Sequence, residues 1–314
     1  MKEIKRLIRK ILPTDTKPVE TKGKKRKEDG NYSRFLEPLK HDPLNAELHA
    51  DFSDYCTEIG NHYLAYAEYR TAVALGLSPN KQILEDKKSS LPELLILNHN
   101  QYYRFRTLAV EVLKRAKEAG LENISILDIG GGHGQLAAFL PDAKYVLVEP
   151  DVNGISGIDL PFEDRSFEFV VACHVLEHIP PEQRHDFLNA LVAKSNTGAV
   201  LLNPIYVEGS HNDARIDLYI DILNARWAKE HKECKLPKVE ELQSYGQENK
   251  VRVDIEYKGT VSSSMALVFA AHYSNAAGLK GQYEKVNRFY NELLIDQLDS
   301  KDFPSFGLFY LTRK

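Results

Sequence analysis

The feature that most constrains this chain is a glycine-rich segment that directly follows a short apolar run. Residues 126–129 read Ile-Leu-Asp-Ile, and residues 130–134 read Gly-Gly-Gly-His-Gly. The apolar run predicts a buried strand, and the glycines predict a tight turn whose backbone can lie close to a ligand. Apolar residues from Leu136 onward predict a helix, whose first N–H groups would face the same ligand.

A second apolar run, residues 145–148, ends at Glu149, twenty-one residues after Asp128. A carboxylate at the end of the second strand can accept hydrogen bonds from both hydroxyls of a ribose. From Ser125 onward, short apolar runs alternate with helical patterns, which is typical of an α/β domain with a parallel sheet. These patterns together predict a nucleoside cofactor bound at the carboxyl ends of parallel strands.

The spacing of the glycines distinguishes between nucleoside cofactors. A dinucleotide-binding turn has the pattern Gly-x-Gly-x-x-Gly. Counted from Gly130, that pattern puts Gln135 where its third glycine belongs. The pattern that fits is Asp-x-Gly-x-Gly-x-Gly, beginning at Asp128. An acid just before the turn repels a pyrophosphate but attracts an ammonium group, which favours S-adenosylmethionine over NAD.

With this pattern the sequence resembles the class I S-adenosylmethionine-dependent methyltransferases, in particular the small-molecule group called type 11, over about residues 125–205. The resemblance also rests on residues 157–170, which contain Asp-Leu-Pro-Phe, and on Cys-His-Val-Leu-Glu-His-Ile at residues 173–179. It implies an α/β fold with a Rossmann-like sheet of seven strands, mostly parallel, whose last strand is antiparallel. The third and fourth of these strands are expected within residues 157–170.

The resemblance further implies roles for single residues. Asp128 would act on the amino group of the cofactor, Asp159 would accept from the adenine amine, and Leu160 would stack on the ring. From the residues alone, Asp159 could equally cap a turn, and His174 could equally be a histidine of the pocket wall. The residues implied in cofactor binding are Asp128, Gly130, Gly132, Gly134, Glu149, Pro150, Asp159, Leu160 and His174.

Two histidines, His174 and His211, are the candidate catalytic residues. A general base helps methyl transfer only when the acceptor hydroxyl keeps its proton until the transition state. His211 lies in the polar segment 204–224, which suits a hydroxylated substrate such as a sugar or forms a surface loop. Glu177 and His178 are expected to be structural or to support the site, and no metal is predicted.

The N-terminal tail, residues 1–30, carries a charge pattern of its own. Residues 1–27 hold eleven Lys or Arg and three Asp or Glu, a net charge of +8 within a chain whose total is −4. Apolar residues at helical spacing predict an amphipathic helix, and residues 1–12 could contact an anionic membrane surface. The alternatives are a solvated arm or a helix docked on a neighbouring domain. The acidic remainder argues against a nucleic-acid partner.

Residues 31–90 are similar to a single tetratricopeptide-like hairpin that turns at Gly60. One repeat cannot bury its own faces, so the hairpin is expected to pack on the next domain. That domain, residues 91–314, would be the methyltransferase domain, with a helical insertion at about residues 257–303. No apolar run reaches membrane-spanning length, and three separated cysteines predict a reducing compartment, so a cytoplasmic or membrane-peripheral location is expected.

The expected function is S-adenosyl-L-methionine-dependent O-methylation of a small-molecule or glycan acceptor, such as a surface polysaccharide or a lipid-linked sugar. The alternative is a non-catalytic scaffold with the same fold that recruits partners through the helical hairpin.

Overall fold

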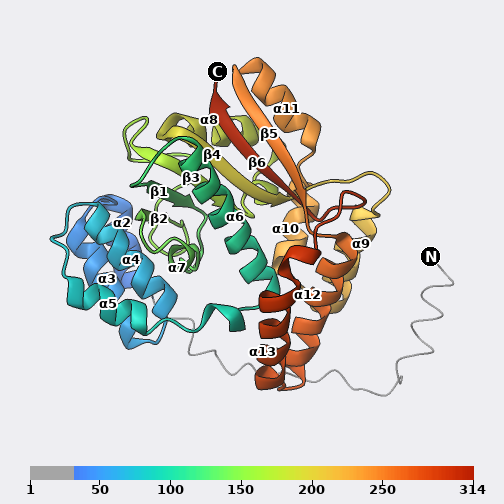
Figure 1. Ribbon diagram of the computed structural model, residues 1–314, viewed down its shortest axis with the longest axis horizontal. Helices are drawn as coiled ribbons and strands as arrows, with labels where there is room; N and C mark the ends of the chain where they lie inside the picture. Colours follow the sequence, from blue (N-terminus) through green and yellow to red (C-terminus); the bar gives the residue numbers. More distant parts are fainter. Residues whose placement is uncertain (1–31) are drawn as a thin grey trace. The chain divides into compact units, whose positions relative to one another are not determined.

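The computed structural model describes residues 32–314, which form one compact unit, so the predicted amphipathic tail lies outside the described residues. A single six-stranded sheet in the order β2-β1-β3-β4-β6-β5 crosses this unit (Figure 1). Strands β1 to β4 run parallel, and β6 is antiparallel to both of its neighbours, as predicted for the last strand. The strands are β1 (Ser125–Ile129), β2 (Lys144–Val148), β3 (Phe167–Cys173), β4 (Ser195–Pro204), β5 (Val251–Lys258) and β6 (Phe306–Arg313).

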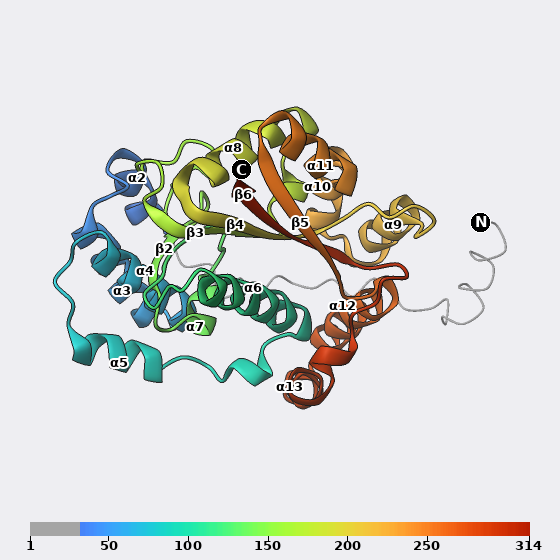
Figure 2. The same ribbon diagram turned by 45° about the horizontal axis from the view of Figure 1, so that its top comes forward.

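Helices cover both faces of the sheet, and each face has its own hydrophobic core (Figure 2). In β3, Val171 packs into the core under α6, whereas Val170 and Ala172 pack into the core under α8. This alternation follows from the two-residue period of a strand. The covering helices are α6 (His99–Glu118) and α7 (Leu136–Phe139) on one face, and α8 (Arg184–Lys194) and α11 (Val239–Glu248) on the other.

The described residues contain six strands and not the predicted seven, because the expected third strand does not form. Side chains cover the outer edge of β2 instead. Thr71 of α4 (His62–Ala74) accepts a hydrogen bond from the Leu147 N–H at 2.9 Å, and Asn153 donates to the Leu147 carbonyl at 2.9 Å. With both backbone groups of Leu147 satisfied, the middle of this edge has no need of another strand.

Two helices, α3 (Ala46–Glu58) and α4, lie where the hairpin was expected and are joined at Gly60, whose φ of 81° favours glycine. Helix α4 packs directly on β2, as expected for a hairpin that cannot bury its own faces. The likeness to a tetratricopeptide repeat and the boundary at residue 90 stay predictions. Two shorter helices, α2 (Ser33–His41) and α5 (Lys81–Ser89), flank the hairpin along the chain.

The buried side chain of Arg70 fastens α4 to the helix that follows the glycine turn. Its guanidinium donates to the carbonyls of Ala137 at 2.6 Å and Leu140 at 2.8 Å, and also to that of Ala143. The last carbonyls of a helix have no partner within the helix itself. The carbonyls of Ala137 and Leu140 also accept hydrogen bonds from backbone N–H groups, but only at 3.4 and 3.3 Å, so Arg70 strengthens these weak bonds and fixes the end of α7.

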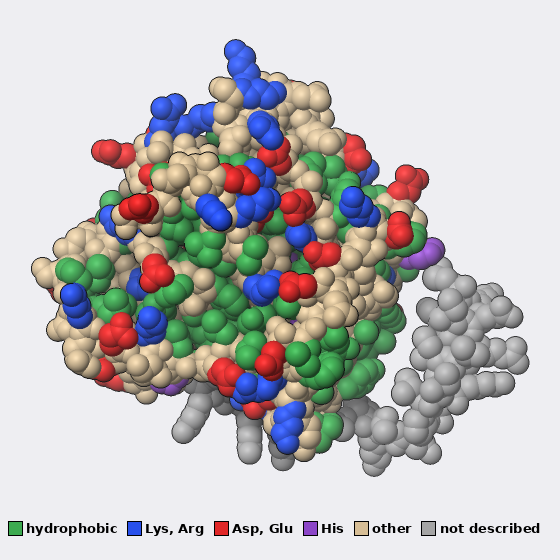
Figure 3. All heavy atoms as spheres, in the orientation of Figure 1, with side chains coloured by type: hydrophobic (Ala, Val, Ile, Leu, Met, Phe, Trp, Pro, Cys, Tyr) green, Lys and Arg blue, Asp and Glu red, His purple; other side chains and the backbone are tan. Residues whose placement is uncertain are grey.

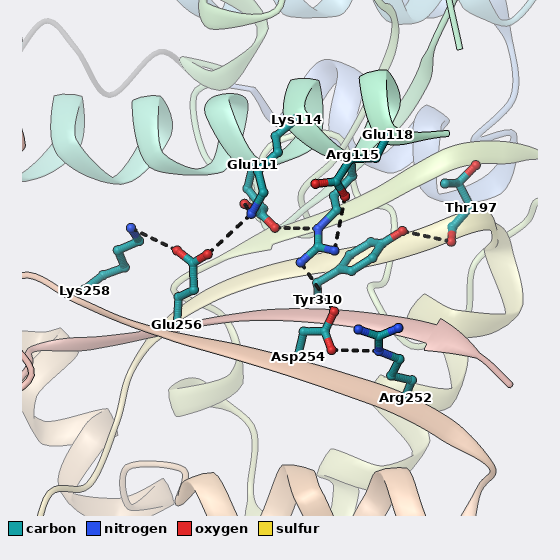
Figure 4. A network of polar contacts seen from close by, with 10 residues as sticks. All are labelled: Glu111, Lys114, Arg115, Glu118, Thr197, Arg252, Asp254, Glu256, Lys258 and Tyr310. Carbon is teal, nitrogen blue, oxygen red and sulfur yellow. Dashed lines mark hydrogen bonds and ion pairs between the residues drawn. The ribbon is translucent and has the colours of Figure 1, made fainter. Parts of the chain in front are cut away.

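Charged side chains also tie α6 to β5 (Figure 4). Arg115 of α6 lies 2.6 Å from Glu111 and 3.4 Å from Asp254, and Lys114 lies 3.4 Å from Glu256. On the face drawn in Figure 3, Lys and Arg side chains are interspersed with Asp and Glu and do not gather by sign.

Four helices lie near the carboxyl ends of the parallel strands. The predicted insertion at about residues 257–303 contains two of them, and a π turn, Tyr290–Leu294, follows the second. Within the described residues, no helix is both long and apolar enough to cross a membrane. The four helices are α9 (Asn212–Leu223), α10 (Arg226–Cys234), α12 (Val261–Ala276) and α13 (Lys280–Phe289).

Candidate functional site

A cavity of about 510 Å³ opens at the carboxyl ends of β1, β3 and β4. Its wall contains the backbone of residues 130–132 after β1, Cys173 and His174 at the end of β3, and Pro204 at the end of β4. Residues of α6, α9, α10 and α12 form most of the rest of the wall, together with His178, Leu236 and Phe306. Open α/β sheets bind ligands at this edge, so the cavity is the candidate functional site.

The glycine turn contributes bare backbone to this wall. Gly130, Gly132 and Gly134 have φ of 70°, 57° and 73°, a left-handed conformation that side chains disfavour. A Cβ added to Gly131 would lie 2.4 Å from a carboxylate oxygen of Asp128, whereas a Cβ added to Gly132 would meet no described atom within 4 Å. Side chains are therefore disfavoured at Gly130 and Gly132 by the left-handed backbone, and excluded at Gly131 by the nearby carboxylate of Asp128.

Two acids flank the glycine turn. Asp128 is fully buried and accepts a hydrogen bond from the Tyr145 hydroxyl, but its Oδ1 has no partner within residues 32–314. Burial raises the pKa of Asp128 to about 7. Glu149 accepts from the Gly132 N–H at 2.9 Å and from the Asp151 N–H at 3.4 Å. Burial also raises the pKa of Glu149 above its usual value.

His174 closes the end of β3 in a left-handed conformation, with φ of 59°. Its ring lies 5.1 Å from that of Phe306, and its Nδ1 lies 3.2 Å from Oε1 of Glu177. Its Nε2 is buried and has no hydrogen-bond partner in the described part of the chain. Burial lowers the pKa of His174 well below 6.5, so the imidazole is neutral and one of its nitrogens can accept a proton.

Other predicted site residues lie elsewhere. Asp159 is exposed, and its N–H contacts Ser156 at 3.4 Å. Leu160 packs in the core under α8, and Pro150 is exposed. His211 is exposed at the start of α9 and is not part of the cavity wall. The structure thus brings the glycine turn, its two acids and His174 together, whereas the four residues of this paragraph do not line the cavity and their roles stay predictions.

The sequence patterns missed part of the wall. Trp227 and His231 lie four residues apart on α10 and therefore share one face of the helix. The Trp227 ring lies 5.1 Å from that of Tyr219 and 5.2 Å from that of His231. Arg215 is held toward this group by hydrogen bonds to the Ser210 carbonyl and the Asn212 side chain. The four-residue spacing of Trp227 and His231 can be seen in the sequence, but it does not indicate against which element α10 packs.

The helical hairpin also supports the site. The Asn61 side chain lies 2.9 Å from Nδ1 of His133, in the middle of the glycine turn. A Cβ added to Gly134 would lie 2.3 Å from the Cβ of Ala67 on α4, so the turn and the hairpin are in close contact. No sequence pattern within residues 31–90 indicated this contact.

Comparison with known proteins identifies the domain around the cavity. Residues 99–249 match a family model described as a methyltransferase domain, in agreement with the predicted methyltransferase domain. A curated relative, an uncharacterized methyltransferase of Mycobacteroides abscessus, is 30% identical over an aligned stretch of 99 residues, covering 24% of this chain and 38% of the relative. The chain thus matches well under half the length of that relative.

Solved structures similar to this chain include further methyltransferases. One is a putative sarcosine dimethylglycine methyltransferase from Galdieria sulphuraria, with a TM-score of 0.44 and 13% identity, covering 67% of this chain and 85% of that one. Another is a SAM dependent methyltransferase from Archaeoglobus fulgidus, with a TM-score of 0.40 and 17% identity. The match covers 66% of this chain and 94% of that one.

Proposed function

We propose that this chain, which carries a class I methyltransferase domain at residues 99–249, transfers a methyl group from S-adenosylmethionine to a hydroxyl of a small-molecule or glycan acceptor. The observation that carries this proposal is the glycine turn of residues 130–134. It presents bare backbone to a cavity of about 510 Å³, with one acid buried beneath it and another hydrogen-bonded to it.

The residues at the turn fit the cofactor. The unpartnered, buried Oδ1 of Asp128 suits the ammonium group of the methionine part, and that charge would favour the ionised carboxylate. Glu149, which already contacts Gly132, would accept hydrogen bonds from the ribose hydroxyls. When bound, the cofactor supplies a methyl group already activated by its sulfonium. The protein's own share is then mainly to position the acceptor.

The far wall of the cavity supports a hydroxylated and negatively charged acceptor. Tyr219 and Trp227 offer flat apolar faces, while Arg104 and Arg215 offer several N–H donors. Arginine pairs well with phosphate or carboxylate groups. A sugar that carries such a group, for example a lipid-linked sugar of a surface polysaccharide, fits this combination. Such an acceptor would bring the reaction to a membrane surface, which the basic residues 1–12 would contact.

His174 is the candidate base of this reaction. It lines the cavity, and its buried Nε2 has no hydrogen-bond partner among residues 32–314. His211, the other candidate from the sequence, is exposed outside the cavity wall. We therefore assign proton acceptance from the acceptor hydroxyl to His174.

The proposal is tested by measuring release of S-adenosylhomocysteine with matched acceptor pairs. Each pair consists of a sugar phosphate or sugar acid and its analogue with an amine in place of one hydroxyl. We expect turnover with the hydroxylated members and weaker turnover with uncharged sugars. Turnover with the amines alone would leave a methyltransferase but contradict O-methylation.

A further inference from the structure

We propose that Glu177, His178 and His231 form a binding site for one divalent transition-metal ion of the Zn²⁺ type in the wall of the cavity. Each residue offers one ligand atom, and these three atoms lie within 4.8 Å of one another. Glu177 and His178 come from the short turn Leu176–His178 after β3, and His231 comes from α10. Two imidazoles and one carboxylate are a donor set that suits such ions.

The two spacings that involve His231 are close to those around a tetrahedral ion. The Nε2 atoms of His178 and His231 are 3.3 Å apart, and Nε2 of His231 is 3.8 Å from Oε1 of Glu177. Around a tetrahedral ion with bonds of 2.0–2.1 Å, neighbouring ligand atoms are about 3.3–3.4 Å apart. The pair formed by His178 and Glu177 lies within 4.8 Å, so side-chain rotation must bring Glu177 closer to His178 for the three residues to share one ion.

A second carboxylate orients the ring of His178. Its Nδ1 lies 2.8 Å from Oε2 of Glu230, and Arg226 donates to the other oxygen of Glu230 at 2.7 Å. A carboxylate at Nδ1 holds the proton there, which leaves the Nε2 lone pair directed at His231 and Glu177. Histidines that bind metals are usually fixed in this way.

Glu177 lacks the partners that a buried carboxylate requires. Its side chain is fully buried, and its Oε1 lies 3.2 Å from Nδ1 of the neutral His174, but neither oxygen has a hydrogen-bond partner in the part of the chain that the structure describes. Burying a charged group without a partner is costly. The nearby guanidinium of Arg184 already binds Glu241 and the carbonyls of residues 234 and 235. A metal ion at the two histidines would supply the missing positive partner.

The position of the site indicates what else the ion binds. His178 and His231 both line the cavity, and three protein ligands leave at least one position of a tetrahedral ion open. Water or an oxygen of a bound molecule would fill that position. This inference departs from the sequence prediction of no metal, because His178 and His231 are 53 residues apart and form no motif.

The site is tested with the full chain after tag removal and chelator treatment, in the absence of cofactor and acceptor. Co²⁺ is titrated while its visible absorption is followed, and Zn²⁺ is titrated by calorimetry. We expect one ion per chain and an absorption band typical of nitrogen and oxygen ligands. Glu177→Gln, His178→Gln and His231→Gln should each weaken binding at least about tenfold. Glu230→Gln, which removes only the support of His178, should weaken it about 10- to 100-fold.

His185→Gln is the matched control, because His185 is half-exposed and lies outside the cluster. It should bind the ion as the wild type does. Absence of binding to the wild type, or equal losses in His185→Gln and His231→Gln, would overturn the proposal. Near-ultraviolet circular dichroism checks folding. If Glu177→Gln does not fold, Glu230→Gln decides the question, because Glu230 is one-third exposed. Binding of S-adenosylmethionine to the metal-free chain is measured separately, so failure of one proposal leaves the other standing.

Discussion

Asp128 shows how one buried carboxyl links the site to the stability of the fold. Its pKa is about 7 in the folded chain, against an ordinary value of 3.8, because burial disfavours the charged form. Between these values the unfolded chain releases the proton while the folded chain keeps it. The contribution of Asp128 to stability is therefore fully present below about pH 4 and is lost as the pH rises to about 7.

We expect Asp128→Asn to remove the loss of stability that the wild type shows as the pH rises from about 4 to about 7. The free energy of unfolding of the wild type, relative to the variant, should fall between pH 4 and pH 7. Chemical denaturation at four or five pH values in that range measures the difference. The pKa of Glu149 is also raised, and its charge contributes to the raised pKa of Asp128, but burial is the larger cause there. A constant difference across the range would show that Asp128 titrates normally.

His174 is the residue at which catalysis is tested. If it accepts the proton from the acceptor hydroxyl, His174→Gln should reduce kcat by about 10²- to 10⁴-fold. Binding of the cofactor should change little. His185→Gln, which alters an exposed histidine, controls for the substitution itself. Equal turnover of His174→Gln and wild type would exclude a base at this position. The sequence could not rank His174 above His211, because only the folded chain separates a cavity wall from an exposed helix start.

At the scale of elements, local patterns predicted β1, β2 and the glycine turn, and the family resemblance implied the antiparallel last strand. The predicted third strand failed for a reason that is not local. Thr71 and Asn153 satisfy the backbone of Leu147 at the edge of β2, and Thr71 is 76 residues away in the sequence. The family pattern of seven strands assumes that this edge is free to pair. The periodicity of apolar residues in the sequence does not indicate that α4 already covers the outer edge of β2.

The contact between α4 and α7 gives a test at this scale. Arg70→Met removes the donors to three carbonyls, those of Ala137, Leu140 and Ala143. Leaving a buried carbonyl without a partner costs about 1–3 kcal/mol. The carbonyls of Ala137 and Leu140 keep long backbone hydrogen bonds, of 3.4 and 3.3 Å. We therefore expect the free energy of unfolding to fall by about 1–3 kcal/mol, measured by urea denaturation.

Arg252→Met is the control for this substitution, because the exposed Arg252 contacts only Asp254 on its own strand. It should change stability by less than about 1 kcal/mol. Similar losses in the two variants would mean that Arg70 does not fasten the end of α7.

At the scale of the whole molecule, the sheet, the helical layers and the place of the site follow the sequence prediction, whereas the composition of the cavity does not. The glycine turn could be predicted from the sequence because all residues of its pattern lie within seven consecutive positions, Asp128 to Gly134. The far wall gathers Arg104, Arg215 and Trp227 from three helices. Such a wall depends on how helices pack, so its residues carry no signal at fixed spacing. For the same reason, the sequence indicates the acceptor less clearly than it indicates the cofactor.

The central claim, a methyltransferase that binds its cofactor at the glycine turn, is tested most directly by calorimetry with S-adenosylmethionine, S-adenosylhomocysteine and NAD. Gly132→Ala and Gly120→Ala form a matched pair, because both glycines have positive φ, 57° and 69°, and open space at the Cβ position. Each alanine should cost about 1–2 kcal/mol in backbone strain, but only Gly132 lines the cavity. We predict that the wild type and Gly120→Ala bind the first two ligands and not NAD, and that Gly132→Ala binds them at least about tenfold more weakly. Binding of NAD alone, or equal affinity in the two variants, would contradict the account.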